Sequence, residues 1–206
     1  MLIIAPSDSH APSPDEILPD GDLAALNAAA AGTNLAPFEI LGESVVPGLT
    51  QVPLILQGTF IQITNTGGSA SFGLQYKPTV PFVASPPGGK IKLTANYISN
   101  NLNISDITQT FVNNPAAPGI GFFMPAGGTI IVGVQYVATG LSLVAAPLAA
   151  TEAAGNRGSV QLNVSSGGSF LVTATVRQVF VNQQTLATVA AAAYSVPIAG
   201  GPVVTG

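Results

Sequence analysis

Apolar and polar residues alternate along much of this chain, and this period of two constrains its fold more than any other feature. The alternation is clearest in segment 69–77, where one set of alternate positions is apolar: Ala70, Phe72, Leu74 and Tyr76. Segments 90–97 and 159–165 repeat the pattern. Because successive side chains of a β-strand point to opposite faces, these segments predict strands with one buried and one wetted face.

Three further segments, 58–65, 129–138 and 169–181, are apolar on both faces, as in strands that are covered on both sides. Glycine pairs separate the strand segments, and those in 65–68 (Asn-Thr-Gly-Gly) and 165–168 (Ser-Ser-Gly-Gly) have the composition of hairpin turns. About seven to nine strands at this spacing, with no helix between them, predict an all-β fold. The expected architecture is an antiparallel β-sandwich of the Ig-like or jelly-roll type.

The two ends of the chain differ in composition from this middle part. Residues 1–36 contain four prolines before residue 20 and predict an extended N-terminal arm. A short helix is expected within the arm, because Asp22 is suited to cap Leu23–Ala31 and a glycine follows to end it. Residues 37–184 are expected to form the β-sandwich body, and residues 185–206 an apolar C-terminal tail.

The tail is too apolar for a solvated disordered segment and too uniform to build a core of its own. We therefore expect it to dock on another subunit, with its own body as the alternative. Segments 129–137 and 170–176 also indicate contact between subunits. They are strongly β-prone yet lack the Lys and Pro residues that protect exposed edges. Strand addition by an arm from a neighbouring subunit would cover such edges.

Charge is scarce and unevenly placed. The 206 residues include five Lys or Arg and nine Asp or Glu, which is 7% of the chain, where an average protein has about 25%. Residues 1–76 carry seven of the nine acids and no base, and residues 77–206 carry all five bases. So few charges favour a surface covered by partner subunits, and the asymmetry would let an acidic arm find the basic side of a neighbour. The alternative is that the acids only keep an exposed arm soluble.

The sequence offers few groups for catalysis, and we expect that the protein is not an enzyme. There is no Cys, and the only His, His10, follows Asp8 and Ser9 in the arm, where adjacent residues do not adopt the geometry of a hydrolase triad. A glycosidase needs two carboxylates about 5–9 Å apart. The acids of the body form no recognisable site of that kind: Glu39, Glu43, Asp106 and Glu152. No catalytic or cofactor-binding residue is therefore predicted.

A metal site is not predicted either. Asp20-Gly21-Asp22, with Glu16 and Asn27 nearby, imitates half of a calcium loop. The full ligand spacing is absent, and helix capping accounts for Asp22.

Sugar binding usually relies on exposed aromatic side chains, and this chain has few that could serve. It has no Trp and four Tyr, of which Tyr76 and Tyr97 fall on the predicted core face. Asn103 and Asn163 each fit the short pattern for N-glycosylation.

Nucleic acid is not an expected partner, because five bases and a pI of about 4.6 leave no basic stripe to neutralise phosphates. No membrane span is expected, since no stretch of about 18 apolar residues runs without interruption. The first residues lack the basic start and the long apolar run of a secretory signal.

These features predict a structural subunit whose partner is itself. Its copies would assemble into an extracellular filament, appendage or sheath through strand-addition contacts of the arms, and its location would be extracellular or at the cell surface. The architecture resembles strand-swapped pilus subunits and jelly-roll coat proteins in general terms, and architecture alone does not fix function. A virion coat or tail protein is the first alternative, and a secreted module that binds a glycan or a surface is the second.

Overall fold

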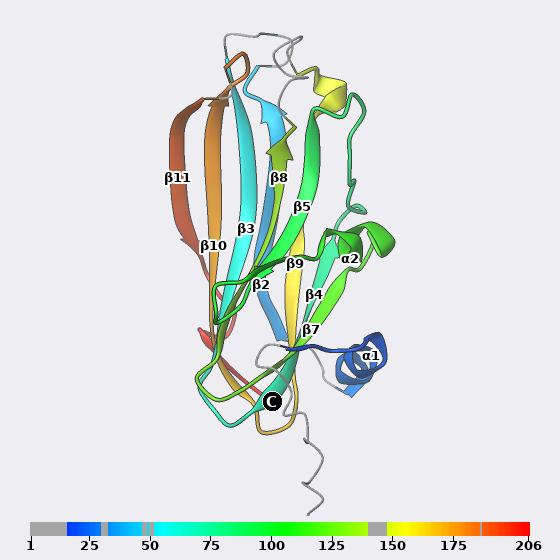
Figure 1. Cartoon of the computed structure of the whole chain (residues 1–206), viewed down its shortest axis with the longest axis vertical. Helices are drawn as coiled ribbons and strands as arrows, with labels where there is room; N and C mark the ends of the chain where they lie inside the picture. Colours follow the sequence, from blue (N-terminus) through cyan, green and yellow to red (C-terminus); the bar gives the residue numbers. More distant parts are fainter. Residues whose placement is uncertain (1–15, 30–32, 47–48, 50–51, 140–147, 186) are drawn as a thin grey trace, which may run out of the picture.

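The structure is a computed structural model that describes residues 16–29, 33–46, 49, 52–139, 148–185 and 187–206 (Figure 1). Most of these residues belong to antiparallel β-strands. The elements in the first half of the chain are β1 (Glu16–Ile17), α1 (Asp20–Ala29), β2 (Thr33–Ser44), β3 (Pro53–Asn65), β4 (Ala70–Pro78), β5 (Ile91–Ile98) and β6 (Ile104–Asp106). Those in the second half are α2 (Thr108–Asn113), β7 (Gly119–Met124), β8 (Thr129–Ala138), the 3₁₀-helix η1 (Ala150–Glu152), β9 (Ala154–Val164), β10 (Ser169–Asn182), β11 (Thr188–Val196) and β12 (Val203–Thr205).

The strands form one continuous 12-stranded sheet that curls into a half-barrel (Figure 1). Its order is β1-β7-β4-β9-β2-β3-β8-β5-β6, and β10 pairs with the other edge of β3 and carries β11 and β12. The predicted antiparallel all-β fold is confirmed. The predicted sandwich is not confirmed, because β2 and β3 remain paired through Leu41–Ser44 and join the two halves of the sheet. The number of strands, 12, also exceeds the prediction, because it includes three short strands, β1, β6 and β12, of only two or three residues each.

The alternating segments fold as expected. Segment 69–77 becomes β4, whose Phe72, Leu74 and Tyr76 are completely buried. The two segments without edge protection are interior strands: β8 lies between β3 and β5, and β10 lies between β3 and the pair β11 and β12. They need neither Lys nor Pro, because strands of the same chain pair with both of their edges.

The two glycine-pair turns are not hairpin turns, as they were predicted to be. Residues 65–68 connect β3 to β4, and residues 165–168 connect β9 to β10, but neither pair of strands is hydrogen-bonded. Each turn instead carries the chain from one half of the curled sheet to the other. The first turn is shaped by Asn65, whose Nδ2 donates to the carbonyls of Gly68 and Met124 (2.8 and 3.0 Å). A local glycine signal identifies a turn, but it does not identify the strands that pair beyond it.

The core lies between the two halves of the sheet. Phe72 on β4 and Phe170 on β10 meet edge to face with ring centroids 5.2 Å apart, and this aromatic contact joins the two halves. Helix α2, which was not predicted, packs against β5 and β7 and buries Phe111 against Tyr76, with ring centroids 5.1 Å apart. Its six residues are too few to give a periodic signal in the sequence.

The predicted N-terminal helix exists but begins earlier than expected. The backbone N–H groups of Asp22 and Leu23 both donate to the carbonyl of Pro19 (3.0 Å each), so α1 starts at Asp20. Asp22 therefore lies in the first turn, where its negative charge interacts favourably with the positive end of the helix dipole. Residues 1–15 and 30–32 of the predicted arm lie outside the described residues, and β2 begins at Thr33.

The C-terminal tail docks on its own body, which was the alternative to the expected docking on another subunit. β11 pairs antiparallel with β10 from Ala174 to Val181, and β12 pairs with Ser169–Leu171 of the same strand. Between them, the N–H of Ala199 donates to the carbonyl of Leu35 on β2 (2.8 Å). The tail ends with Val204 in the core. One edge of β10 accepts both strands, and no sequence pattern reveals which edge a tail will meet.

Two buried tyrosines allow a matched test of this core. The hydroxyl of Tyr76 has no hydrogen-bond partner among the described residues, and burial raises its pKa. The hydroxyl of Tyr136 donates to Asn156 Oδ1 (2.8 Å), and burial raises its pKa to about 12. We expect Tyr76→Phe to leave the free energy of unfolding unchanged or raise it by about 1 kcal/mol, because an unsatisfied polar group is removed. Tyr136→Phe should lower it by about 1–2 kcal/mol, because Asn156 loses its donor.

Chemical denaturation of the two variants and the wild type measures this difference. Equal losses of stability in both variants would contradict the assignment of the two hydroxyls.

Candidate functional site

The residues considered for catalysis or metal binding do not come together in the described part of the chain. Asp8, Ser9 and His10 lie outside it. The side chains of Glu16, Asp20 and Asn27 are not described, and Asp22 is exposed on α1. No group of three or more His, Cys, Asp or Glu residues that could hold a metal ion occurs among the described residues.

The four carboxylates of the body lie on different elements. Glu152 on η1 forms an ion pair with Lys90 (2.7 Å), and the hydrogen bond from Lys90 lowers the pKa of its carboxyl. Hydrogen bonds from Thr108 lower the pKa of Asp106, the last residue of β6. Glu39 on β2 faces Arg157 at 3.5 Å, and Glu43, the fourth, lies on the same strand. A general acid of a glycosidase needs a raised pKa, so the two lowered values run against that role.

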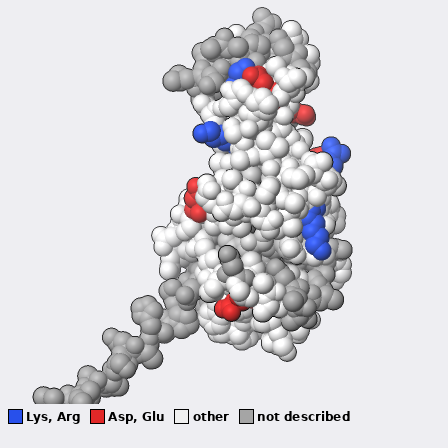
Figure 2. Space-filling model, turned by 90° about the vertical axis from the view of Figure 1, so that its right-hand side faces the viewer, with Lys and Arg blue, Asp and Glu red and all other residues white. Residues whose placement is uncertain are grey.

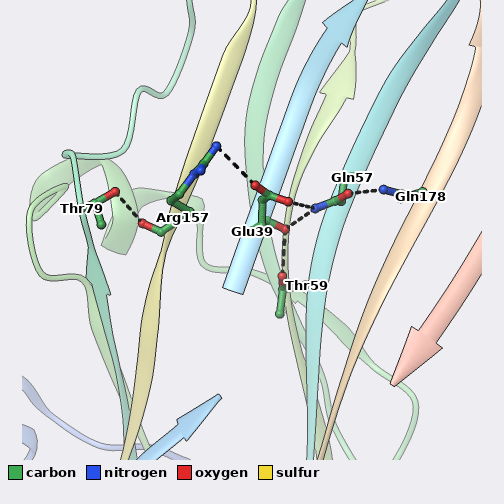
Figure 3. Close-up of polar contacts among 6 residues, drawn as sticks. All are labelled: Glu39, Gln57, Thr59, Thr79, Arg157 and Gln178. Carbon is green, nitrogen blue, oxygen red and sulfur yellow. Dashed lines mark hydrogen bonds and ion pairs between the residues drawn. The ribbon is translucent and has the colours of Figure 1, made fainter. Parts of the chain in front are cut away.

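The polar contacts around Glu39 mark the point where the sheet divides (Figure 3). β3 pairs with β2 through Leu54–Gln57 and with β8 from Gly58 onwards. Where β2 leaves β3, the Glu39 carbonyl accepts hydrogen bonds from Gln57 Nε2 (2.9 Å) and Thr59 Oγ1 (3.1 Å). Both side chains are buried. They replace the backbone donors that β2 no longer finds on β3, and so they fix the fork.

This fork was not predicted from the sequence, although it leaves a signal there. The polar residues Gln57 and Thr59 interrupt the apolar run of β3 on either side of Gly58. Gln178 on β10 extends the contact by donating to Gln57 Oε1, so the polar chain spans from β9 to β10 (Figure 3). All of these groups satisfy one another, which gives the cluster a structural role.

The free edge of the sheet is at β11, at the left of the molecule in Figure 1. Among the described strands, β11 pairs only with β10, so its other edge has unpaired backbone groups. It is nine residues long, with the sequence TVAAAAYSV, and eight of these residues are exposed. The strands at the two ends of the main sheet order, β1 and β6, have only two and three residues. β11 is therefore the long edge that this sheet presents.

This edge lacks the usual protection by charge or proline, and its one irregularity is a shift of register with β10 near Val189. Lys, Pro and inward-pointing charges stop natural edge strands from pairing with other chains, and β11 contains none of them. Its Ala190–Ala193 run places no bulky side chain on either face. A strand of another chain could thus approach along β11 without meeting a charge, and along Ala190–Ala193 without meeting a large side chain.

The remaining surface is also poor in charge. On the face drawn in Figure 2, charged side chains lie singly or in small groups and are separated by wide uncharged areas. Exposed apolar residues occur at several places, including Tyr194 on β11 and the cross-strand pair Leu171 and Val203 on β10 and β12. Tyr76 is buried as predicted, and Tyr97 is partly buried and packs against Phe122 at 5.0 Å.

The two asparagines of the N-glycosylation pattern have different environments. Asn163 is 2% exposed on the interior strand β9, whereas Asn103 is exposed in the turn between β5 and β6. Only Asn103 is accessible to an enzyme in the folded protein.

No helix in the described residues is long and apolar enough to cross a membrane. A scan of protein-family models, a search of curated proteins and a search of solved structures found no match to this chain.

Proposed function

We propose that the protein is a structural subunit that assembles with copies of itself by adding strands at the β11 edge. The observation that carries this proposal is a nine-residue edge strand with no charge, no proline and eight exposed residues. Such an edge is a template for pairing with another chain. In a monomer such an edge would promote aggregation, whereas in an assembly it would provide a contact between subunits.

The chemistry of the edge favours a second copy as the occupant. An antiparallel strand pair is compatible with two-fold symmetry, so β11 of one subunit can pair with β11 of another through the same backbone groups. The Ala side chains let the strands approach with no steric conflict. The small side chains bury little apolar area, however, and stable interfaces bury at least about 1,000 Å². A lasting assembly therefore needs a second contact, which the N-terminal arm is suited to supply.

The assembly that we propose is an extracellular filament, appendage or sheath, in which the half-barrel is the repeating unit. The scarcity of charge across the whole chain supports a surface that is largely covered by partners. A closed shell or tube of a virion would use the same contacts, and electron microscopy of the assembled protein distinguishes it from an open fibre. A glycan-binding module is less well supported, because two of the four tyrosines, Tyr76 and Tyr136, are completely or almost completely buried.

Charge placed on the edge tests this proposal. We expect the double variant Ala190→Lys and Ala192→Lys to weaken self-association at least about tenfold, because pairing of two β11 strands brings like charges together. Both residues are exposed, so the fold should tolerate them. The matched control places the same two charges on exposed residues of α2, as Gln109→Lys and Asn113→Lys.

Sedimentation velocity and negative-stain microscopy measure assembly, and circular dichroism checks the fold. The control should assemble like the wild type. The proposal fails if the edge variant assembles as well as the control, or if the wild type stays monomeric at high concentration.

A further inference from the structure

A hollow on the outer surface of the sheet offers the second contact that assembly needs. It has a volume of about 440 Å³ and extends over four neighbouring strands, from β5 across β8 and β3 to β10. Its walls are mainly aliphatic and include Leu56, Ile98, Ile104 and Val179. Ile104 is 71% exposed, so the hollow presents apolar surface to solvent.

Two glycines lie next to the ring of Phe60, which lines the hollow. Gly58 and Gly133 lie on the adjacent strands β3 and β8, and the ring of Phe60 lies over Gly133, where an added Cβ would be 2.6 Å from the ring. The Arg177 guanidinium in turn lies over this ring, 4.3 Å from its centroid. Glycine within a strand often marks a place where another group approaches closely. Here the ring and the guanidinium that lies over it both line the hollow.

The charge of the hollow is a single cation. Arg177 is the only charged residue in its lining, and it is exposed. A guanidinium on an aromatic ring keeps its donors free for a carboxylate in the plane of the fork. The hollow therefore fits an extended apolar segment that carries one acid.

Residues 1–15 have this composition. They contain three consecutive aliphatic residues, Leu2-Ile3-Ile4, followed by Asp8, and they contain no Lys or Arg. Pro6 favours an extended backbone between the two features, since it restricts its own φ and the residue before it.

The spacing also fits. Ile98 lies three strand spacings, about 14 Å, from β10, where Thr173 is in register with it. Arg177 is four residues, about 13 Å, farther along β10, so the diagonal from Ile98 to Arg177 is about 19 Å. Six extended residues from Leu2 to Asp8 span about 20 Å, so Asp8 reaches Arg177 when Leu2 lies beside Ile98.

We propose that this hollow binds residues 2–8 of a second copy, with the aliphatic residues against its walls and the Asp8 carboxylate on Arg177. This inference rests on the proposed self-assembly and names the contact that completes it. We assign a second copy as the occupant, because the β11 edge alone buries too little area for a lasting assembly, which therefore needs a further contact between subunits. The acidic front part and the basic remainder of the chain would then meet between subunits.

Disulfide trapping tests this contact cleanly, because the chain has no Cys of its own. One preparation carries Ser9→Cys, which leaves Asp8 intact, and a second, with a different affinity tag, carries Val179→Cys in the hollow. After mixing and mild oxidation, we expect the mixed dimer to form at least about tenfold faster than with Gln109→Cys on α2 as the partner. Adding Arg177→Glu to the Val179→Cys chain should slow trapping about tenfold, and Asp8→Lys in the other chain should restore it.

Two results would overturn the inference. The first is that cysteines at Val179 and Gln109 are trapped at equal rates. The second is that one chain carrying both Ser9→Cys and Val179→Cys forms, when diluted, only the disulfide within that chain. Failure here is distinct from failure of the β11 edge. If the edge variant loses assembly while no mixed dimer forms, the edge proposal stands and this inference falls. If the wild type is monomeric and no mixed dimer forms, both fall.

Discussion

Gln183→Leu should lower the free energy of unfolding by about 4 kcal/mol, one of the two largest effects expected of a single substitution in this protein. Gln183 is completely buried just after β10. Its Nε2 lies 2.9 Å from Ser44 Oγ, 3.1 Å from the Leu49 carbonyl and 2.9 Å from the Val52 carbonyl. Its Oε1 accepts from the N–H of Leu148 (2.9 Å). The side-chain amide of Gln183 thus holds together two segments: the chain between β2 and β3, and the residues just before η1.

Leucine has a similar size but removes the partner of the buried Leu148 N–H, of the Ser44 hydroxyl and of the partly buried carbonyls of Leu49 and Val52. Each unsatisfied buried group costs about 1–3 kcal/mol, so several together make a large effect. The neighbouring residue provides the control, because Gln184 is exposed and Gln184→Leu should change stability by less than about 0.5 kcal/mol. Thermal unfolding should show a fall of about 10 °C in Tm for the first variant and little change for the second. Similar values for both would contradict the role assigned to the buried amide.

Gly158→Ala should lower the free energy of unfolding by about 3 kcal/mol through steric overlap alone. Gly158 lies on β9 between Phe38 of β2 and Pro78 of β4. An added Cβ would overlap the carbonyl oxygen of Lys77 and lie 2.8 Å from the Cα of Pro78. These are backbone atoms of the next strand, so the clash is relieved only by moving β4 away from β9.

Gly155→Ala on the same strand is the matched control. There an added Cβ would lie 3.0 Å from Leu41 Cδ2, the flexible end of a side chain, which can move aside. We expect a loss of less than about 1 kcal/mol. Urea denaturation of the two variants measures the difference. A Gly158→Ala variant as stable as Gly155→Ala would show that the strands do not approach as closely at Gly158 as the structure describes.

The local elements of this protein could be predicted from the sequence because their signals are local. The alternation of Phe72, Leu74 and Tyr76 with polar residues predicts β4 and its buried face. The apolar segment 129–138 corresponds to β8 residue for residue. Helix α1 was expected from its alanines, and its start is displaced to follow Pro19.

The candidate assembly site was predicted only in part. The sequence indicated an apolar tail and too few charges for an ordinary surface, and it placed the unprotected strands at 129–137 and 170–176. The structure shows that these are interior strands and that the unprotected edge belongs to β11 within the tail. An edge is defined by the absence of a neighbouring strand, which is a property of the whole sheet.

The sequence alone determined that this chain forms antiparallel strands, that it has few charges and that most of its acids precede its bases. Only the tertiary structure decided which strands pair, that the glycine turns cross between the halves of the sheet, and that Arg177 and Phe60 meet in an apolar hollow. The physical reason is the distance along the chain between the residues that interact. The direction of a strand side chain depends on its immediate neighbours in the sequence, whereas pairing, edges and hollows depend on contacts between residues far apart in the chain.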